Sequence, residues 1–400
     1  MPEERIVLKN CGRIDPKDID SYIAKGGFKA LDKALSQLKP VDIIKLVRES
    51  GLRGRGGAGF PTGVKWELAA NTTADVKYII CNADEGEVGT FKDRFLLEND
   101  PFTLIEGMAI AGFAIGASKA FIYLRAEYQY LRGLVESAIQ QVREKGYFNK
   151  RNFKFDIEIC ENAGAYVCGE ETALMESIEG KRGEARFKPP FPPTSGLWEK
   201  PSIINNVETL MNIPHIVLNG ASWFSAIGTE KSKGTKVFSV SGDVERPGIY
   251  ELRMGSTLEE LVVDLCGAKD VKMIQVGGTA GRVLPASEIE VPLSFETLLG
   301  AGAIIVYNKD RDVLDIVLKT MEFFEEESCG KCVPCREGTA VMHQILDEIK
   351  QSGPGNGNLD MLCEIADTMK SCSLCGLGQS APTCFVDTLQ HFPEEYRSKT

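Results

Sequence analysis

Between residues 76 and 160, short apolar runs alternate with longer segments of helical periodicity. Val76–Cys81, Ala120–Leu124 and Phe155–Cys160 have the length and composition of buried strands, whereas Leu104–Ile115 and Leu131–Val142 repeat apolar side chains at helical spacing. Strands that alternate with helices pair in parallel, and both faces of their sheet are covered. The pattern therefore predicts an α/β domain, in which ligands bind beyond the carboxyl ends of the strands.

The two ends of the chain show other patterns. Before the α/β pattern, an apolar run at Ile6–Leu8 predicts a short strand, and helical periodicity covers Ile19–Leu38 and Val41–Val47. After residue 235, a hairpin, one helix and further strands predict a small ubiquitin-like α+β module. Its predicted elements are Lys236–Ser241, Gly248–Leu252, Leu258–Cys266, Met273–Val276 and Ile304–Tyr307. From residue 312 onward the pattern is helical.

Composition and charge narrow the class of protein. The chain has 400 residues, a formal net charge of −11 and no long basic run, which argues against nucleic acid as a partner. The most apolar candidate helix, Phe102–Ile115, contains Glu106 and is too short to cross a bilayer. Twelve cysteines without a secretory signal favour metal or redox chemistry over disulfides. We expect a cytoplasmic protein that inserts no segment into a membrane, although it can lie peripherally on a membrane complex.

A glycine-rich loop at Gly51–Gly63 is the first candidate binding element. Six of its thirteen residues are glycine, so its backbone can adopt positive φ and approach another molecule closely. Its N–H groups can form a concave site for an anion, with Arg53 and Arg55 beside it. Phe60 offers a ring and Lys65 an ammonium group. These groups suit a ligand with a phosphate and an aromatic ring, although a flexible surface turn has a similar composition.

Two loops that follow predicted strands combine glycine with amide and carboxylate side chains. Asn82–Gly89 follows the first strand, and Asn162–Glu171 follows the third. Such side chains can accept hydrogen bonds from ribityl or ribose hydroxyls and from flavin N–H groups. Either loop alone is more typical of a solvated acidic surface. Two of them at equivalent strand ends, together with the glycine loop, favour a cofactor cleft.

Two later segments add further polar and aromatic groups. Phe187–Thr194 is stiffened by prolines and can hold Lys188 and Phe191 over a cleft, although a rigid linker has the same composition. Pro201–Thr209 is expected to begin another helix with two asparagines at its head, where free N–H groups favour anions.

The cysteines near the C-terminus form the most specific motif. Cys329, Cys332 and Cys335 make a Cys-x2-Cys-x2-Cys run, and Cys375 follows forty residues later. Three thiolates at this spacing can hold one face of a cubane, which a remote fourth thiolate completes. The competing interpretation is a zinc ion held by two Cys-x2-Cys pairs, Cys332 with Cys335 and Cys372 with Cys375. That zinc site is less favoured because its two pairs are far apart and Cys329 has no role in it.

The chain as a whole resembles the FMN- and NADH-binding subunit of respiratory complex I and its relatives in NAD-linked hydrogenases, including electron-bifurcating ones, and formate dehydrogenases. The resemblance runs over nearly all residues and rests on these motifs: Arg53–Phe60, Asn82–Glu87, Gly169–Glu171, Asn205-Asn206 and the four cysteines. It implies a Rossmann-like FMN domain, a soluble-ligand-binding β-grasp domain and a helical bundle with a [4Fe–4S] cluster. We expect these domains at residues 73–234, 235–311 and 312–400, after an N-terminal helical and glycine-loop region at 1–72.

The resemblance also implies which residues bind the flavin. Gly54, Gly56, Gly57 and Lys65 are similar to the residues that cradle the FMN phosphate and ribityl chain. Further flavin contacts are implied for Asn82, Asp84, Tyr166, Gly169, Asn205 and Asn206. Arg55, Glu85, Glu170 and Ile204 complete the expected cofactor-binding set.

For the nucleotide, the resemblance implies that Phe60 and Phe191 enclose the adenine of NADH, with Glu87, Glu171 and Lys188 around it. Hydride transfer to a flavin needs no protein base. The two residues assigned to catalysis, Glu87 and Glu171, are therefore expected to act by positioning. Because both are carboxylates, they are expected to repel a 2′-phosphate and so to favour NADH over NADPH.

The implied function is transfer of a hydride between NADH and FMN and of single electrons between FMN and the cluster. Expected partners are a thioredoxin-like [2Fe–2S] subunit and a further iron–sulfur or catalytic subunit. This sequence lacks the iron–sulfur extensions of many bifurcating relatives, so its electrons are expected to leave through another chain. Val88 replaces a usual proline, and Leu68 replaces an aromatic residue that often lines the NADH site. The alternative function is a non-catalytic docking subunit, stabilised by zinc or a cluster, that has lost the flavin.

The fourth cluster ligand has several candidates among the late cysteines. Cys375 matches the family's Cys-Gly-Leu-Gly motif, and its glycines let backbone N–H groups approach the cluster. Cys372 lies one helical turn earlier and could replace it as a ligand. Alternatively, Cys363, Cys372 and Cys384 could hold a separate zinc together with His391.

Overall fold

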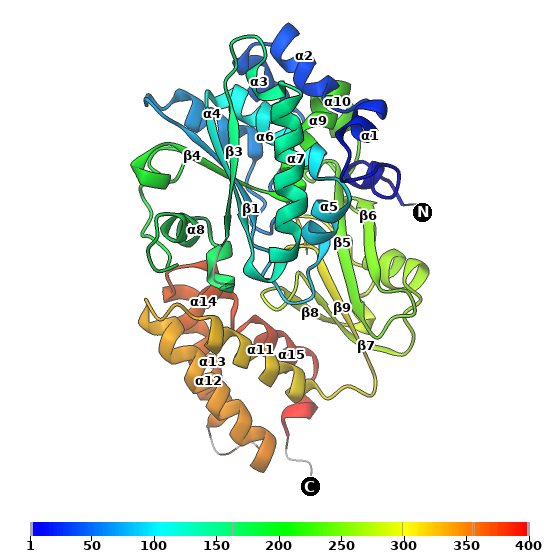
Figure 1. Cartoon of the computed structure of the whole chain (residues 1–400). Coiled ribbons are helices and arrows are strands. Elements are labelled where there is room, and N and C mark those ends of the chain that lie inside the picture. Colours follow the sequence, from blue (N-terminus) through cyan, green and yellow to red (C-terminus); the bar gives the residue numbers. More distant parts are fainter. Residues whose placement is uncertain (1–2, 162–163, 298, 354, 356, 398–400) are drawn as a thin grey trace.

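A four-stranded parallel sheet in the order β3-β2-β1-β4 lies at the centre of the first half of the chain (Figure 1). Its strands are β1 (Tyr78–Ala83), β2 (Lys119–Leu124), β3 (Asp156–Glu161) and β4 (Ser202–Asn206). The structure is a computed structural model that describes residues 3–161, 164–297, 299–353, 355 and 357–397. The prediction of an α/β fold with a parallel sheet is confirmed.

The strand β4 corrects the prediction that Pro201–Thr209 only begins a helix. This segment contains just two adjacent isoleucines, which is too short a run to show a period. β4 pairs with β1 so that Asn206 lies beside Asn82. The helix α9 (Val207–Asn219) starts directly afterwards, and the Asn206 side chain caps it by accepting a hydrogen bond from Glu208 N.

Helices cover both faces of this sheet, as its alternating strands and helices require. On one face, Ile79, Ala120 and Ile122 share a core with the N-terminal helices and with α6, α7 and α9. On the other face, Ile80 and Phe121 share a core with α8 and with helices from the C-terminal end. The helices of this half, besides α9, are α1 (Ile19–Ala24), α2 (Lys29–Gln37), α3 (Pro40–Glu49), α4 (Thr62–Asn71), α5 (Lys92–Asn99), α6 (Pro101–Ile115), α7 (Arg132–Glu144), α8 (Glu171–Ile178) and α10 (Ala221–Ser225).

The N-terminal segment differs from its prediction in two places. The strand predicted at Ile6–Leu8 is wrong, because Val7–Lys9 forms a 3-10 turn. The Glu251 carboxylate accepts hydrogen bonds of 2.9, 3.0 and 2.9 Å from three successive N–H groups there, which otherwise need a neighbouring strand. The single helix expected over Ile19–Leu38 is interrupted by a Gly-Gly pair, after which Phe28 has a positive φ of 61°.

A second sheet follows, in the order β6-β5-β9-β7-β8, and forms the β-grasp module drawn in yellow-green and yellow in Figure 1. β5 and β9 are parallel, and the other neighbours are antiparallel. Its elements are β5 (Thr235–Gly242), β6 (Gly248–Arg253), a helical segment at Glu260–Leu265, β7 (Val271–Val276), β8 (Arg282–Pro285) and β9 (Ala303–Asn308). The predicted hairpin, helix and two later strands are confirmed, and β8 is an additional edge strand.

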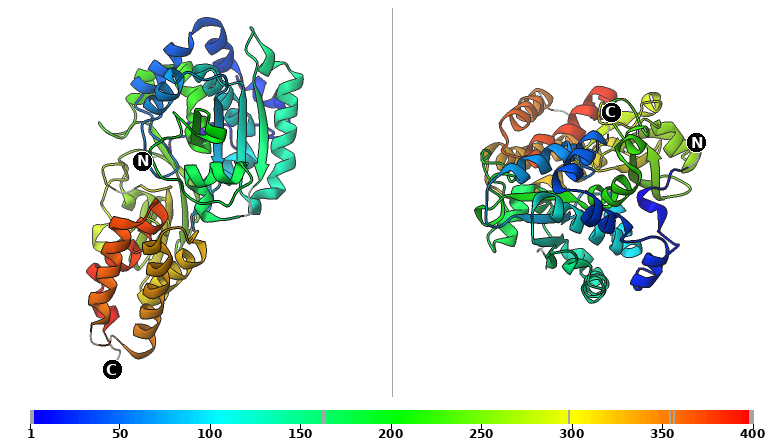
Figure 2. Two further views of the ribbon diagram at one scale, coloured as in Figure 1. Left: turned by 90° about the vertical axis from the view of Figure 1, so that its left-hand side faces the viewer. Right: turned by 90° about the horizontal axis from the view of Figure 1, so that it is seen from above.

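The C-terminal part is helical and protrudes from one end of the molecule, as the orange and red ribbons of Figure 2 show. Its helices are α11 (Val313–Glu327), α12 (Val333–Ser352), α13 (Asn358–Cys372), α14 (Gly376–Ser380) and α15 (Thr383–His391). In the part of the chain that the structure describes, no helix has both the length and the apolarity needed to cross a membrane. The domain boundaries given above stay predictions.

Removal of the Glu251 carboxylate should loosen the N-terminal segment. Glu251 is fully buried and also accepts a hydrogen bond from Thr235 Oγ1 at 2.5 Å, so Glu251→Ala leaves this hydroxyl and three N–H groups unpaired. We expect the free energy of unfolding, measured by urea titration, to fall by about 3 kcal/mol. Glu245→Ala is the matched control, because Glu245 is exposed and pairs only at the surface with Lys269 and Arg246. Equal losses in the two variants would contradict this role of Glu251.

Candidate functional site

A cavity of about 480 Å³ lies beyond the carboxyl ends of β1 and β4. It is enclosed by the glycine loop before α4, the loop after β1, the turn before α8, two turns of the β-grasp module and the start of α14. The sequence-predicted residues that line it are Gly56, Gly57, Asn82, Asp84, Glu85, Glu87, Tyr166, Gly169, Glu170 and Asn206. Asn162 and Ala163, at the start of the second predicted loop, lie outside the described residues.

Hydrogen bonds fix the loop after β1 against the rest of the cavity. Asn82 Nδ2 donates to Gly169 O at 2.9 Å, and Asn82 Oδ1 accepts from Asp84 N at 3.1 Å. The Glu85 carboxylate accepts two backbone N–H groups at the start of α5, at 2.8 and 3.0 Å. Burial, followed by the nearby charge of Asp93, raises the pKa of Glu85 to about 7. The loop therefore presents its polar atoms to the cavity in a fixed arrangement.

Glu87 connects this loop to two other parts of the molecule. Its carboxylate accepts hydrogen bonds from Tyr166 OH at 2.7 Å, from Ala280 N at 3.1 Å and from Thr279 Oγ1. Burial raises the pKa of Glu87, and these donors oppose that shift. The ring of Tyr166 packs edge-on against Phe323 of α11, with ring centroids 5.1 Å apart.

The cavity wall suits a ligand with both polar groups and a flat ring. Among the described residues, the buried Thr90 Oγ1 in this wall has no hydrogen-bond partner. A Cβ at Gly56 would lie 3.0 Å from Asn206 Cβ, so glycine allows the backbone to approach this side chain without crowding. Gly57 has a φ of 123°, a conformation that glycine adopts without strain. Exposed backbone, an unpaired hydroxyl and amide side chains together fit the phosphate, ribityl and ring groups of FMN.

A cluster of two lysines and two glutamates lies beside the cavity, and its charges balance. Lys65 Nζ is 2.7 Å from Glu171 Oε2 and donates to Ile204 O at 2.9 Å. Lys188 Nζ is 3.0 Å from Glu171 Oε1 and 2.9 Å from Glu170 Oε1. Burial would raise the pKa of Glu171, but the two ammonium groups lower it overall. The two carboxylates therefore face two lysines, and the group has no net negative charge.

The arginines of the glycine loop do not line the cavity, and their expected role beside an anion stays a prediction. Arg55 is fully buried and donates to the carbonyl oxygens of Lys233 at 2.6 Å and Thr235 at 3.1 Å. Arg53 lies over the ring of Phe295 at 4.2 Å from its centroid. Both side chains thus fasten the loop to the β-grasp module.

The remaining predicted residues do not line the cavity. Gly54 N donates to Phe60 O at 2.9 Å, which closes the loop. Asn205 Oδ1 accepts a hydrogen bond from the indole of Trp66 at 2.9 Å. Phe60 is 50% and Phe191 55% exposed, and neither ring contacts another aromatic ring within the described residues. Exposed rings of this kind are available to a planar ligand.

Several lining residues have no sequence motif. Thr90, Lys92 and Asp93 follow the predicted Asn82–Gly89 loop directly, and a longer boundary for that loop would have included them. Gly277, Ala280, Gly300 and Ala301 come from the β-grasp module, and Gly376, Leu377 and Ser380 from α14. Both sets reach the cavity through tertiary packing. The β-grasp residues carry no local signal, whereas Gly376 and Leu377 belong to the Cys-Gly-Leu-Gly motif, which was assigned to the cluster and not to the cavity.

Four cysteines surround a smaller pocket next to this cavity. Cys329, Cys332, Cys335 and Cys375 all line it, together with apolar side chains. Backbone N–H groups at the start of α14 point to the Cys375 sulfur and lower its pKa, whereas burial raises it more. A Cβ at Gly378 would lie 2.8 Å from Cys335 Cβ, so glycine permits this approach. Four converging thiols, of which Cys335 is buried and the others are partly buried, fit the thiolate ligands of an iron–sulfur cluster, because bound iron supplies the positive charge that the thiolates need.

The cysteine pocket and the cofactor cavity share a wall. Val167 and Leu377 line both, and Gly376, the residue after Cys375, lines the cavity. The cysteine loop is also tied to the segment before Lys188, because Lys331 Nζ donates to Ala185 O at 2.8 Å. The cysteines are thereby linked to both the cavity and the nucleotide segment.

The cysteines proposed for zinc do not meet. Cys363 and Cys372 are exposed on α13, whereas Cys384 is buried in the core of the bundle. His391 Nδ1 lies 3.8 Å from a carboxylate oxygen of Glu288. In the part of the chain that the structure describes, no three His, Cys, Asp or Glu side chains are arranged to hold a single ion.

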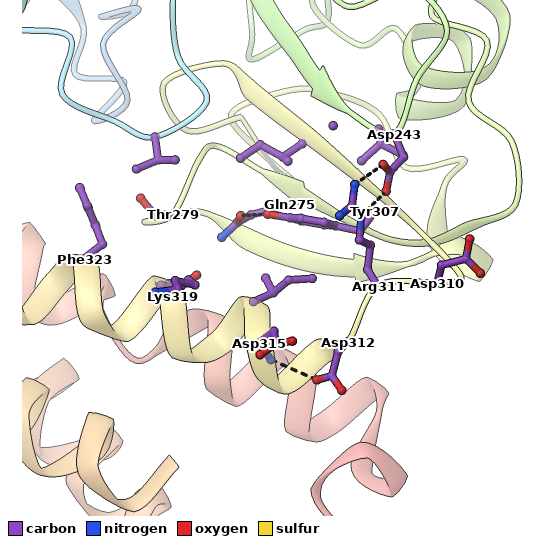
Figure 3. A pocket seen from close by; sticks show the side chains of 16 residues that line it. Asp243, Gln275, Thr279, Tyr307, Asp310, Arg311, Asp312, Asp315, Lys319 and Phe323 are labelled. Atoms are coloured by element: carbon purple, nitrogen blue, oxygen red, sulfur yellow. Dashed lines mark hydrogen bonds and ion pairs between the residues drawn. The ribbon is translucent and has the colours of Figure 1, made fainter. Parts of the chain in front are cut away.

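A further cavity of about 560 Å³ lies between the β-grasp sheet and α11 (Figure 3). Figure 3 shows a hydrogen bond between Tyr307 and Gln275 and a hydrogen-bonded ion pair between Arg311 and Asp243 in this cavity. It contains none of the predicted cofactor-binding residues. Val88, at its edge, is 42% exposed.

The fold and the two adjoining pockets define a redox subunit that binds a flavin and an iron–sulfur cluster. The family model "Nuo51 FMN-binding domain" matches residues 47–215, "NADH-ubiquinone oxidoreductase-F iron-sulfur binding region" matches 315–399, and "SLBB domain" matches 237–279. The chain belongs to the family of FMN- and [4Fe–4S]-binding subunits of NADH–quinone oxidoreductases and NAD-reducing hydrogenases. It is an NAD(H)-linked oxidoreductase subunit whose cofactors are FMN and a [4Fe–4S] cluster.

Individual relatives support this assignment. The chain is 43% identical to an NADH-quinone oxidoreductase subunit of Rhizobium meliloti, over 98% of this chain and 97% of that protein. It is 45% identical to the NADP-reducing hydrogenase subunit HndC of Solidesulfovibrio fructosivorans, over 98% and 83%. The crystal structure of an NAD+-reducing [NiFe]-hydrogenase in the H2-reduced state superposes with a TM-score of 0.91 at 39% identity. That match covers 98% of this chain and 66% of the solved chain.

The two late cysteines that lie closest in sequence should behave differently on substitution. Cys375 lines the cysteine pocket, whereas Cys372 is exposed at the end of α13. We expect Cys375→Ala to abolish or severely reduce the EPR signal of the reduced cluster while FMN stays bound. Of these two cysteines, only Cys375 can supply a thiolate to the pocket. Cys372→Ala is the control and should retain the signal. Loss of the signal in Cys372→Ala, with retention in Cys375→Ala, would reverse this assignment.

Proposed function

We propose that the chain transfers a hydride between NADH and FMN in the larger cavity and single electrons between FMN and a cluster held by Cys329, Cys332, Cys335 and Cys375. The observation that carries this proposal is the wall shared by the two pockets, formed by Val167 and Leu377. A flavin in the cavity would be separated from the cysteines by little more than the first residues of α14.

In this proposal, the chemistry belongs to the cofactors and the orientation to the protein. When bound, FMN takes up a hydride as an electron pair and releases electrons singly to the cluster. The glycine loop offers backbone N–H groups to the phosphate and ribityl chain, and Asn82 and Asn206 fix the polar edge of the cavity. Glu87 and Tyr166 hold each other at the face of the cavity and position the nucleotide. None of these residues needs to take up a proton from the substrate.

The nucleotide would extend from this cavity towards Phe60 and Phe191. Relatives include proteins named as NADP-reducing and as NAD-reducing, so nucleotide choice has to be argued from the site. Glu171 engages both Lys65 and Lys188 and so keeps their charges from a 2′-phosphate. We therefore infer a preference for NADH that depends on these ion pairs rather than on net negative charge.

The chain would work as one subunit of a larger redox complex. Its relatives are named as subunits of NADH–quinone oxidoreductases and of hydrogenases. We propose a thioredoxin-like [2Fe–2S] subunit and a further iron–sulfur or catalytic subunit as partners, because a flavin that accepts electron pairs needs a continuing path for single electrons. Formate dehydrogenases are a further complex in which such a subunit would serve.

The cofactor content of the isolated chain tests the proposal directly. After anaerobic preparation we expect one FMN and one [4Fe–4S] cluster per chain, measured by flavin absorbance and by iron and sulfide analysis. NADH should reduce an artificial dye, while ferredoxin or quinone should be reduced only when partner subunits are present. A colourless protein would favour the docking function instead. Robust quinone reduction by the isolated chain would contradict the need for partners.

Nucleotide choice should respond to Glu171. Glu171→Gln removes the charge that engages two lysines, so these lysines become available to a 2′-phosphate. We expect the ratio of kcat/KM for NADPH over NADH to rise by about tenfold, measured with a dye acceptor. Glu67→Gln is the control, because Glu67 is partly exposed and, among the described residues, forms its ion pair with Arg48. An unchanged ratio in Glu171→Gln would remove Glu171 from nucleotide selection.

A further inference from the structure

Lys92 is a buried cation in the wall of the cofactor cavity. It is the first residue of α5, is 1% exposed and lines the cavity. Its Nζ lies 2.6 Å from Asp93 Oδ1 and 3.0 Å from Glu208 Oε2, and it donates to Asn206 Oδ1 at 3.2 Å. Burying an ammonium group costs free energy unless the group is paired and hydrogen-bonded. The three partners of Lys92 meet this condition and hold its charge in the cavity wall.

One of the two carboxylates that pair with Lys92, Glu208, is shared with a second lysine. Glu208 is fully buried and also lies 2.6 Å from Lys236 Nζ, while it accepts a hydrogen bond from Val237 N at 2.8 Å. Lys236 is fully buried but does not line the cavity. Glu208 therefore divides its charge between two lysines, of which only Lys92 faces the cavity.

Arg55 adds a third positive charge to this region. It is close enough to Glu208 to lower the pKa of that carboxyl, although its own donors are used by backbone carbonyl oxygens. Two further buried carboxylates, Glu85 and Glu251, lie near Lys92 and Arg55 respectively, so the region as a whole has no excess of positive charge. Among the described residues that line the cavity, however, Lys92 is the one cation, and an anion bound there would face it.

We propose that Lys92 holds the negative charge of bound FMN, either on its phosphate or on its ring after reduction. The inference rests on the proposed FMN site and adds a residue to it. The contact that an anion would replace is the one to Asn206 Oδ1, which is the longest of the three. Asn206 Oδ1 would still accept from Glu208 N at 3.0 Å, so the exchange leaves no acceptor unpaired. Asp93 and Glu208 act as positioning residues.

Flavin titration of the full-length chain tests this role. The apoprotein, freed of FMN, is titrated with FMN while the quenching of flavin fluorescence is followed. We expect Lys92→Met to weaken FMN binding by at least about tenfold, and Lys92→Arg to restore most of the loss because it keeps the charge. Lys119→Met is the control, since Lys119 lies on β2 in a partly exposed pair with Glu158, and should stay within about twofold of the unsubstituted chain.

Riboflavin, which lacks the phosphate, separates the two sources of negative charge. A loss for FMN with unchanged riboflavin affinity assigns Lys92 to the phosphate. Unchanged affinity for both oxidised flavins, with a lower midpoint potential of the bound flavin, assigns it to the reduced ring, because the ring carries negative charge only after reduction. Either outcome supports the proposal.

Unchanged FMN affinity and unchanged midpoint potential in a folded Lys92→Met variant would overturn it. If that variant does not fold, the double variant Lys92→Met with Asp93→Asn keeps the net charge of the region, and unchanged FMN affinity together with an unchanged midpoint potential there would overturn it equally. Failure of the unsubstituted chain to bind FMN would instead contradict the proposed function, so the two failures are distinguishable.

Discussion

The hydrogen bonds of Glu87 join the three parts of this molecule at one carboxylate. Glu87 follows β1, accepts hydrogen bonds from Thr279 of the β-grasp module and Tyr166 of the α/β region, and reaches α11 through the contact between Tyr166 and Phe323. Gly278 has to be glycine, since a Cβ there would lie 2.3 Å from Glu87 Cγ. A buried carboxylate is stable only with such donors, so the three parts hold one arrangement around it.

This arrangement determines where the cofactors can lie. The cavity is closed by glycine turns at Gly277 and Gly300 from the β-grasp module and by Leu377 from the helical bundle. A Cβ at Gly300 would lie 2.4 Å from Gly277 Cα, so the two turns contact through their backbones. An isolated α/β region would therefore leave the flavin site open on two sides. The helical bundle that closes the cavity also carries the four cysteines. The same packing of the bundle therefore closes the cavity and places the cysteines beside it.

The sequence predicted those parts of the site that are local. The Asn82–Gly89 loop, the glycine loop and the cysteine run each have a spacing with a direct chemical meaning, and the structure places them around two adjoining pockets. The sequence could not place Gly300 in the cavity wall, and it assigned the motif that contains Leu377 to the cluster alone, because both positions in the wall depend on packing between distant segments. The 3-10 turn at Val7–Lys9 was missed for the same reason: its partner, Glu251, lies in another sheet.

The roles of the charged side chains were the hardest to predict from the sequence, because the effect of a charge depends on where the end of its side chain lies in the fold. Arg55 and Lys92 are both fully or almost fully buried, and only the arginine lies in a recognisable motif. Yet the donors of Arg55 are used by backbone carbonyl oxygens, whereas Lys92 reaches the cavity. A guanidinium has five N–H donors in a plane and can fasten several strands of backbone at once, whereas an ammonium acts as a compact point charge. In this fold the arginine fixes the glycine loop through backbone contacts, and Lys92 is the buried cation that lines the cavity.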